Sequence, residues 1–207
     1  VRGADGRARR EQLLRHLHVT LPRSRVQRRA FLEVGHRTRP IEAEHAEVDV
    51  EGGRIRGDVL ILDGVVSAVG EGLAAEAPTP GVERLDASGH LVFPGLTDPQ
   101  VHFREPGMPH KEDLSSGSLA AIAGGVTAFY EMPNTKPNTD SPEHLEDKLS
   151  RASGRCHADY GFFIGGTREN ADRLGEWETL PGCAGIKVFM GSSTGSLLVA
   201  DDPTLER

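Results

Sequence analysis

Strand-like and helix-like segments alternate through the second half of the chain. Glycines 124 and 125 close the first helical segment, and Ser141 begins the second with Pro142 behind it, as a helix N-terminus prefers. Parallel strands need a crossover connection, so this alternation predicts an α/β fold with a parallel sheet. We expect strands at 96–98, 126–132, 160–164 and 186–190, and helices at 112–123, from 141 onward and at 169–180.

Such a sheet can be an open, doubly wound sheet or part of a closed barrel. A complete (β/α)8 barrel needs about 250 residues, whereas only 114 residues run from Pro94 to Arg207. If the fold is a barrel, the sequence covers about its first half. We would then expect residues 1–207 alone to be inactive.

A shorter β-rich region precedes the alternation. Asp63 and Gly64 stand between two apolar runs, which is a strong signal for a two-residue hairpin turn. The pattern predicts a small antiparallel β domain at residues 41–93, followed by a second domain at 94–207. Its expected strands are 47–50, 58–62, 65–69, 82–85 and 91–93.

The first 40 residues differ in charge from the rest. They hold 11 arginines and three acidic residues, a net charge of +8, whereas residues 41–207 hold 13 basic and 28 acidic residues, a net charge of −15. We interpret residues 1–40 as a disordered or non-native extension; a basic arm for nucleic acid or membrane and a mitochondrial transit peptide are the alternatives. The acidic remainder argues against nucleic acid as a partner.

Neither a membrane span nor a disulfide framework is indicated. No apolar run approaches the ~18 residues of a membrane helix, and no apolar stretch follows the arginine-rich start as in a signal peptide. Cys156 and Cys183 are the two cysteines and form no close pair. A cytoplasmic protein is therefore expected.

Four ordered motifs carry a family resemblance. They are PGLTDPQVHFREPG at 94–107, GGVT at 124–127, MPNT at 132–135 and GIKVFM at 185–190. Together they resemble the dihydroorotases, in the cyclic-amide branch of the amidohydrolase superfamily, over about residues 48–207. The resemblance implies the first half of a metal-dependent (β/α)8 barrel, preceded by the small β domain.

Gln100 and His102 are the first candidate metal ligands. Residues i and i+2 of a strand point to the same side, and at the carboxyl end of a barrel strand that side is the active-site mouth. The family carries His-x-His here, on a divalent metal such as Zn²⁺. Gln100 replaces the first histidine, and an amide oxygen is a weaker zinc ligand than an imidazole nitrogen.

Lys187 is the third candidate ligand, because a lysine inside an apolar strand is costly when charged. The resemblance implies that it is carbamylated and bridges two metals. A lysine whose amine extends from the strand end into solvent is the alternative.

Arg104 and Asn134 follow the first two strands. The resemblance implies that they bind the substrate carboxylate, an anion that suits a guanidinium fork and an amide. The alternative for Arg104 is a surface salt bridge to Glu105 or Glu112.

The resemblance implies reversible hydrolysis of dihydroorotate to N-carbamoyl-aspartate in pyrimidine biosynthesis. It also implies a homo-oligomer when the protein is complete. The general base would come from later strands, so we assign none. The alternatives are a hydantoinase- or allantoinase-type enzyme, and a non-catalytic partner of aspartate transcarbamoylase, which Gln100 favours.

Overall fold

The computed structural model describes residues 41–50, 53–62, 65–73, 83–191 and 195–206. These residues fall into two compact units, with the division between Leu96 and Thr97, and each is considered by itself. The predictions for residues 1–40 and for the turn at Asp63 and Gly64 lie outside the described residues. None of the described helices is both long and apolar enough to span a bilayer.

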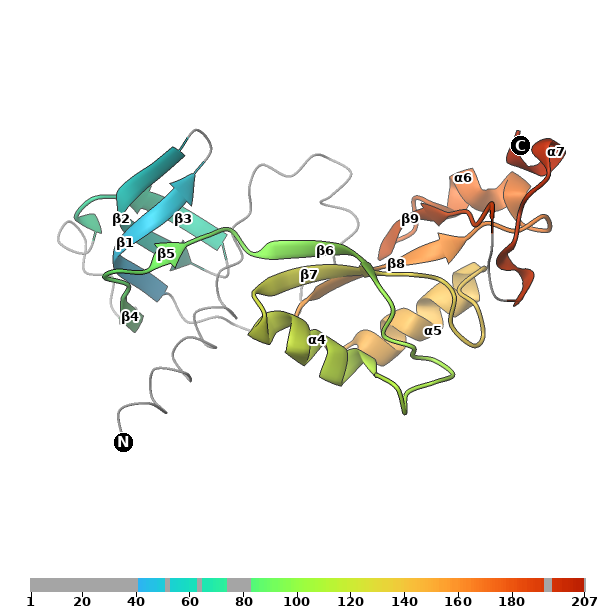
Figure 1. Cartoon of the computed structure of the whole chain (residues 1–207), viewed down its shortest axis with the longest axis horizontal. Helices are drawn as coiled ribbons and strands as arrows, with labels where there is room; N and C mark the ends of the chain where they lie inside the picture. The colour runs from blue at the N-terminus through green and yellow to red at the C-terminus, as the bar shows by residue number, and fades with distance from the viewer. Residues whose placement is uncertain (1–40, 51–52, 63–64, 74–82, 192–194, 207) are drawn as a thin grey trace. The chain divides into compact units, whose positions relative to one another are not determined.

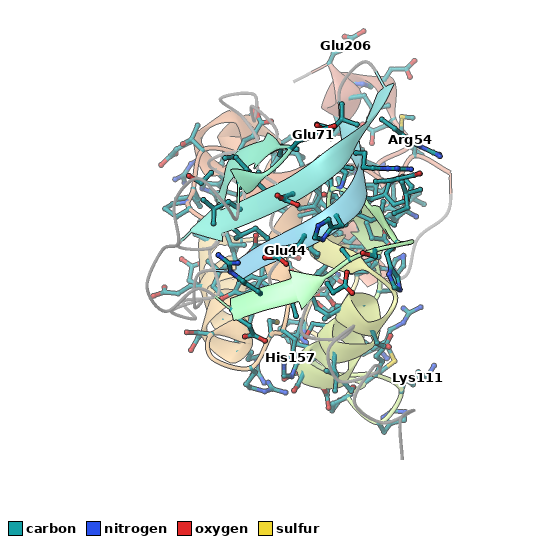
Figure 2. All side chains as sticks on the ribbon, turned by 90° about the vertical axis from the view of Figure 1, so that its left-hand side faces the viewer. Glu44, Arg54, Glu71, Lys111, His157 and Glu206 are labelled. Atoms are coloured by element: carbon teal, nitrogen blue, oxygen red, sulfur yellow. The ribbon has the colours of Figure 1, made fainter. Side chains whose placement is uncertain are left out.

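The first unit is a five-stranded β-sheet. In it β1 (Ile41–Val50), β2 (Gly53–Leu62) and β3 (Val65–Gly70) form an antiparallel meander. Leu62 pairs with Val65, which leaves two residues between the paired strands, as the hairpin prediction requires. Glu44 of β1 and Arg54 of β2 are labelled on this sheet in Figure 2.

The sheet is mixed, although the sequence predicted a wholly antiparallel one. Both β4 (Glu83–Asp86) and β5 (Leu91–Val92) pair with β1 in parallel. Twelve residues separate Gly70 from Glu83, enough chain for the crossover that a parallel pair needs. The alternate side chains of this sheet form a small core of Val48, Val59, Ile61, Leu85, Ala87 and Val92.

The second unit contains a four-stranded sheet with the order β6-β7-β8-β9 (Figure 1). The strands are β6 (Leu96–Val101), β7 (Val126–Glu131), β8 (Asp159–Gly165) and β9 (Cys183–Lys187). The pairs β7–β8 and β8–β9 are parallel. Each strand lies beside its neighbours in sequence, whereas a doubly wound sheet reverses its order at a switch point. The order is that of a barrel wall.

Two of the predicted helices are present, each with a capping residue before it. Helix α4 (Leu114–Ala123) begins two residues later than predicted, after Asp113, whose carboxylate accepts the backbone N–H of Ser116, and Gly124 is its C-cap as predicted. Helix α5 (Pro142–Ala152) starts after Ser141, whose hydroxyl oxygen accepts the backbone N–H of His144. These local bonds satisfy N–H groups that lack partners inside the helix.

The helix predicted at 169–180 is wrong. The structure has a 3₁₀ turn, η1 (Ala171–Arg173), followed by the short helix α6 (Leu174–Trp177). The Asn170 side chain accepts the Thr167 N–H at 2.7 Å and donates to the Gly165 and Asp140 carbonyls at 2.9 Å. An asparagine that bonds neighbouring backbone in this way competes with helix formation.

The strand predicted at 186–190 begins and ends earlier, at Cys183 and Lys187. Phe189 instead makes an isolated bridge to Leu198, next to η2 (Gly195–Leu197). The last helix is α7 (Asp202–Leu205). Lys187 is therefore the final residue of its strand and not an interior one.

The core of the second unit lies between the sheet and the helices α4 and α5. Phe103 and Phe129 pack edge to face, with ring centroids 4.8 Å apart. Gly117 of α4 allows this close packing, since a Cβ at that position would lie 2.6 Å from Phe103 Cδ1. The core includes Phe103, Leu114, Ile122, Phe129, Leu145, Ala152, Phe162 and Ile164.

We expect both cysteines to be unreactive in the folded chain. Burial raises the pKa of Cys156 to about 12, and burial also raises the pKa of Cys183. The thiolate is the reactive form, and a thiol of pKa about 12 is ionised to only about one part in 10⁴ at pH 8. A thiol-specific dye should therefore label neither residue at pH 8 until a denaturant is added. Rapid labelling of the native chain would contradict this.

Candidate active site

The candidate site residues lie at the carboxyl ends of the parallel strands. Gln100 lies in β6 and His102 one residue beyond it; Asn134 follows β7, and Lys187 ends β9. The carboxyl ends of parallel strands meet at one edge of the sheet, where βα-loops form active sites in barrel enzymes.

His102 lies close to three other candidate residues, Arg104, Asn134 and Lys187. It is half-buried, and burial lowers its pKa. The positive charges of Arg104, Lys148 and Lys187 lower the pKa further, whereas the amide of Asn134 opposes the change. His102 thus lies near a side chain that follows β7 and another that ends β9. An imidazole whose pKa is below its usual value of about 6.5 is neutral at pH 7, with a free nitrogen lone pair.

Gln100 does not join this group. Its side chain is exposed and makes no hydrogen bond to any described residue, and its backbone N–H donates to Asp98 Oδ1 at 2.9 Å. Strand β6 ends at Val101, so the alternation of side chains that was expected to align Gln100 with His102 stops between them. The ligand role of Gln100 stays a prediction that this geometry does not support.

Lys187 is half-buried, and its amine lies 5.2 Å from the centre of the Phe189 ring. It makes no ion pair with any acidic side chain among the described residues. A cation stacked on an aromatic face is weakly held compared with one in a buried ion pair. The amine therefore lies at the strand ends without a fixed anionic partner in the described part of the chain.

Arg104 is half-buried and has a left-handed backbone conformation, with φ = 65°. Neither of the salt bridges considered for it, to Glu105 or Glu112, is found in the structure, and Glu105 binds Arg155 instead. Asn134 is also half-buried, and its Oδ1 has no hydrogen-bond partner among the described residues. An unpaired buried polar atom is costly, and a bound polar ligand would satisfy it.

Sequence reasoning missed a buried ion pair below the site. Lys148 Nζ lies 2.9 Å from Glu131 Oε2 and 3.2 Å from the Met132 carbonyl oxygen, and both side chains are at most 1% exposed. Burial raises the pKa of Glu131 and lowers that of Lys148, while their attraction opposes both changes. One signal was available: Lys148 stands three residues after Leu145 and four before Ala152, on the buried face of α5.

A family model described as dihydro-orotase-like matches residues 89–165. The match contains β6, β7, β8, the helices α4 and α5, and every candidate site residue except Lys187.

Curated relatives and solved structures agree with this relationship. The dihydroorotases of Bacillus cytotoxicus and Bacillus thuringiensis are each 38% identical to the chain over 133 residues, which cover 63% of the chain and 30% of the relative. An L-hydantoinase (dihydropyrimidinase) from Arthrobacter aurescens has a TM-score of 0.69 at 26% identity, covering 81% of this chain and 37% of that one. A D-hydantoinase from Thermus sp. has a TM-score of 0.64 at 29% identity, with 80% and 36% coverage.

The chain is thus similar to the cyclic amidohydrolases. It spans about 30% of the length of these curated relatives. The structure confirms the predicted fold class, the first strands of a (β/α)8 barrel preceded by a small β domain.

Proposed function

We propose that the chain supplies part of a dihydroorotase active site, for reversible hydrolysis of dihydroorotate to N-carbamoyl-aspartate in pyrimidine biosynthesis. The observation that carries the proposal is Arg104. This guanidinium is near His102 and makes no ion pair with any described residue. The 38% identity to dihydroorotases supports the same substrate.

The substrate carboxylate is the feature that Arg104 and Asn134 would recognise. A planar guanidinium can donate two parallel hydrogen bonds to a carboxylate, and the side-chain NH2 group of Asn134 can donate a third. Dihydropyrimidines and hydantoins lack this carboxylate on the ring. Solved structures similar to this one include hydantoinases, so a hydantoinase-type activity is the second candidate.

We propose Zn²⁺ as the cofactor, held by His102 and a carbamylated Lys187. Among the described residues no group of three or more His, Cys, Asp and Glu side chains could hold a metal ion. Donors taken from the described residues would therefore include another residue type. His102 fits, because its lowered pKa keeps the imidazole in the neutral form that binds metals. Lys187 fits as a carbamate, an anion with two oxygens, since no described carboxylate holds its amine.

When bound, zinc would polarise the ring carbonyl and lower the pKa of a water molecule. The chain's own residues would orient the substrate. Arg104 would hold the carboxylate and Asn134 would bond the same anion or the ring. Together they would place the scissile amide beside His102. Such positioning can provide much of an enzyme's rate enhancement, because the entropy cost of bringing the reacting groups together is met when the substrate binds.

We expect Arg104→Met to lower kcat/KM for dihydroorotate selectively. Loss of a charge-assisted hydrogen bond costs about 1.5–3 kcal/mol, or roughly 10- to 150-fold. The test protein is a chimaera in which residues 89–207 replace the corresponding part of the Bacillus cytotoxicus dihydroorotase. Its kcat/KM for dihydroorotate should fall by that factor, while its kcat/KM for dihydrouracil should change little.

Two results would overturn the proposed function. Equal losses on both rings would show that Arg104 does not bind a carboxylate, and would favour the hydantoinase-type alternative. A folded chimaera with no activity on either ring would favour a non-catalytic role. The matched control is Arg151→Met, because Arg151 lies on α5 in an exposed ion pair with Asp147 and has no part in the proposed carboxylate site.

A further inference from the structure

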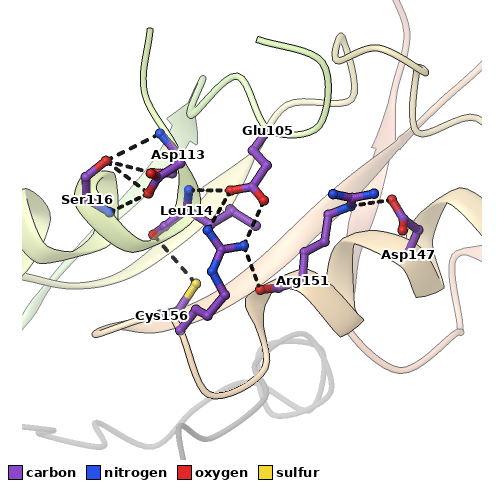
Figure 3. Close-up of polar contacts among 8 residues, drawn as sticks. Glu105, Asp113, Leu114, Ser116, Asp147, Arg151 and Cys156 are labelled. Atoms are coloured by element: carbon purple, nitrogen blue, oxygen red, sulfur yellow. Dashed lines mark hydrogen bonds and ion pairs between the residues drawn. The ribbon is translucent and has the colours of Figure 1, made fainter. Parts of the chain in front are cut away.

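The residue after Arg104 is bound unusually firmly. Glu105 has a side chain only 8% exposed, and its two carboxylate oxygens accept hydrogen bonds from Arg155 at 2.7 and 3.1 Å (Figure 3). The backbone N–H of Leu114, the first residue of α4, donates to Oε2 at 3.0 Å. Burial alone would raise the pKa of Glu105, but the bonds from Arg155 and Leu114 lower it. Glu105 is therefore an ionised carboxylate with both oxygens occupied.

This pair joins segments far apart in the sequence. Arg155 follows the end of α5 and also donates to the Arg151 carbonyl at 3.2 Å. The carboxylate of Glu105 thus links the loop after β6 to the start of α4 and to the end of α5. A bidentate guanidinium–carboxylate pair fixes orientation as well as distance.

The same loop is also fixed on its other side. The Arg104 carbonyl accepts the N–H of Met108 at 2.9 Å, and the Pro106 carbonyl accepts the N–H of Lys136 at 3.1 Å. Lys136 is two residues beyond Asn134, so the second bond joins the loops of the two proposed carboxylate-binding residues. Arg104 has φ = 65°, a conformation that is unfavourable for a residue with a Cβ and persists where its surroundings hold it.

The occupied oxygens of Glu105 explain why Arg104 stays available. Adjacent residues of opposite charge could neutralise each other, but Glu105 is paired with Arg155. The Arg104 guanidinium makes no ion pair with any acid in the described ranges. Arg155 therefore keeps Glu105 from competing with a substrate anion.

We propose that Glu105 and Arg155 are positioning residues that hold Arg104 for the substrate carboxylate, so that selectivity between carboxylated and uncarboxylated rings depends on this pair. The inference rests on the proposed function and names a further determinant of its specificity. If the pair had a purely structural role, its substitution would change the affinity for both kinds of ring to the same extent.

The experiment compares two ligands on the 207-residue chain. Dissociation constants for dihydroorotate and dihydrouracil are measured by ligand-observed NMR for the unsubstituted chain, Glu105→Gln and Arg155→Lys. We expect each variant to weaken the binding of dihydroorotate about 10-fold more than the binding of dihydrouracil. This factor is within the ~100-fold that a misplacement of 1 Å can cost. Arg155→Lys keeps the positive charge but loses the two-pronged guanidinium. It is the variant on which the test depends if Glu105→Gln does not fold.

Two controls separate positioning from general stability. Arg151→Lys alters the other arginine pair of Figure 3, whose partners Arg151 and Asp147 are 43% and 42% exposed, and should leave both constants within about twofold. Glu105→Gln in an Arg104→Met background should change neither constant, because the residue through which it acts is gone.

The outcomes distinguish this inference from the proposed function. The positioning role is wrong, while the proposed function stands, in either of two cases. In the first, Glu105→Gln and Arg155→Lys weaken the binding of both rings equally; in the second, Glu105→Gln keeps its effect in the Arg104→Met background. If Arg104→Met itself leaves the ratio of the two constants unchanged, the proposed function fails and the inference fails with it. If the unsubstituted chain binds neither ring, the pair does not hold Arg104 for a carboxylate and the inference alone fails.

Discussion

Lys148→Met should destabilise the chain by about 3–5 kcal/mol, the usual cost of removing one partner of a buried ion pair. The change leaves the carboxylate of Glu131, which is fully buried, without its counter-charge. It also removes the hydrogen bond to the Met132 carbonyl. Equilibrium unfolding in guanidinium chloride, followed by circular dichroism, measures the loss.

The double variant Glu131→Leu, Lys148→Met should regain most of that stability, because a buried pair can often be replaced by apolar residues without loss. Arg151→Met is the control, since an exposed pair contributes about 0–1 kcal/mol. A single Lys148→Met variant as stable as the unsubstituted chain would show that the pair is not buried in solution.

The effect of Lys148→Met should also depend on pH. Burial raises the pKa of Glu131, and without Lys148 nothing opposes that rise. An acid with a raised pKa in the folded state destabilises the fold above that pKa, and the penalty disappears as the pH falls towards the unfolded value. The destabilisation measured at pH 7 should therefore shrink as the pH is lowered to 5. A loss that grows on acidification would contradict this assignment.

The elements that sequence predicted well are those with local causes. Ser141 caps the start of α5 through a bond to the backbone three residues away, and Gly124 caps the end of α4, so a pattern of neighbours is enough to predict both. The apolar runs of β7 and β8 are long enough to read as buried strands. In each case the deciding interaction lies within a few residues of the element it creates.

The elements that sequence predicted poorly depend on distant contacts. Residues 169–180 have a helical composition, but Asn170 bonds the carbonyl of Asp140, 30 residues earlier in the chain. The start of β9 at Cys183 is set by pairing with Phe162 of β8. The hydrophobic periodicity within either segment does not indicate these distant contacts.

The candidate site shows the same division. Motif positions placed His102, Arg104 and Asn134 at strand ends, where the structure has them. The pairing of Glu105 with Arg155, across 50 residues, could not be read from the sequence, and Glu105 was instead a candidate partner for Arg104. Gln100 was aligned with His102 by strand alternation, whereas β6 ends at Val101, between the two residues.

Lys187→Ala should remove zinc and activity together, which is the largest functional effect that we expect. A neutral lysine amine attacks the carbon of CO2 and loses a proton, and the resulting carbamate is the anionic ligand that we propose. The Lys187 amine ends β9 near His102 and has no described acidic partner, so the reaction would break no ion pair of the described residues.

The chimaera with the Bacillus cytotoxicus dihydroorotase, grown with zinc, provides the test. Its metal content by mass spectrometry and its ¹³C NMR signal after exposure to labelled bicarbonate should both be lost in Lys187→Ala, and its kcat should fall to background. Lys111→Ala is the control, because Lys111 is exposed in the loop before α4. A short carboxylic acid added to Lys187→Ala should restore part of both metal and activity, since it can occupy the position of the carbamate. Full zinc content and normal turnover in Lys187→Ala would show that this lysine is no ligand and that the metal, if one binds, is held by other residues.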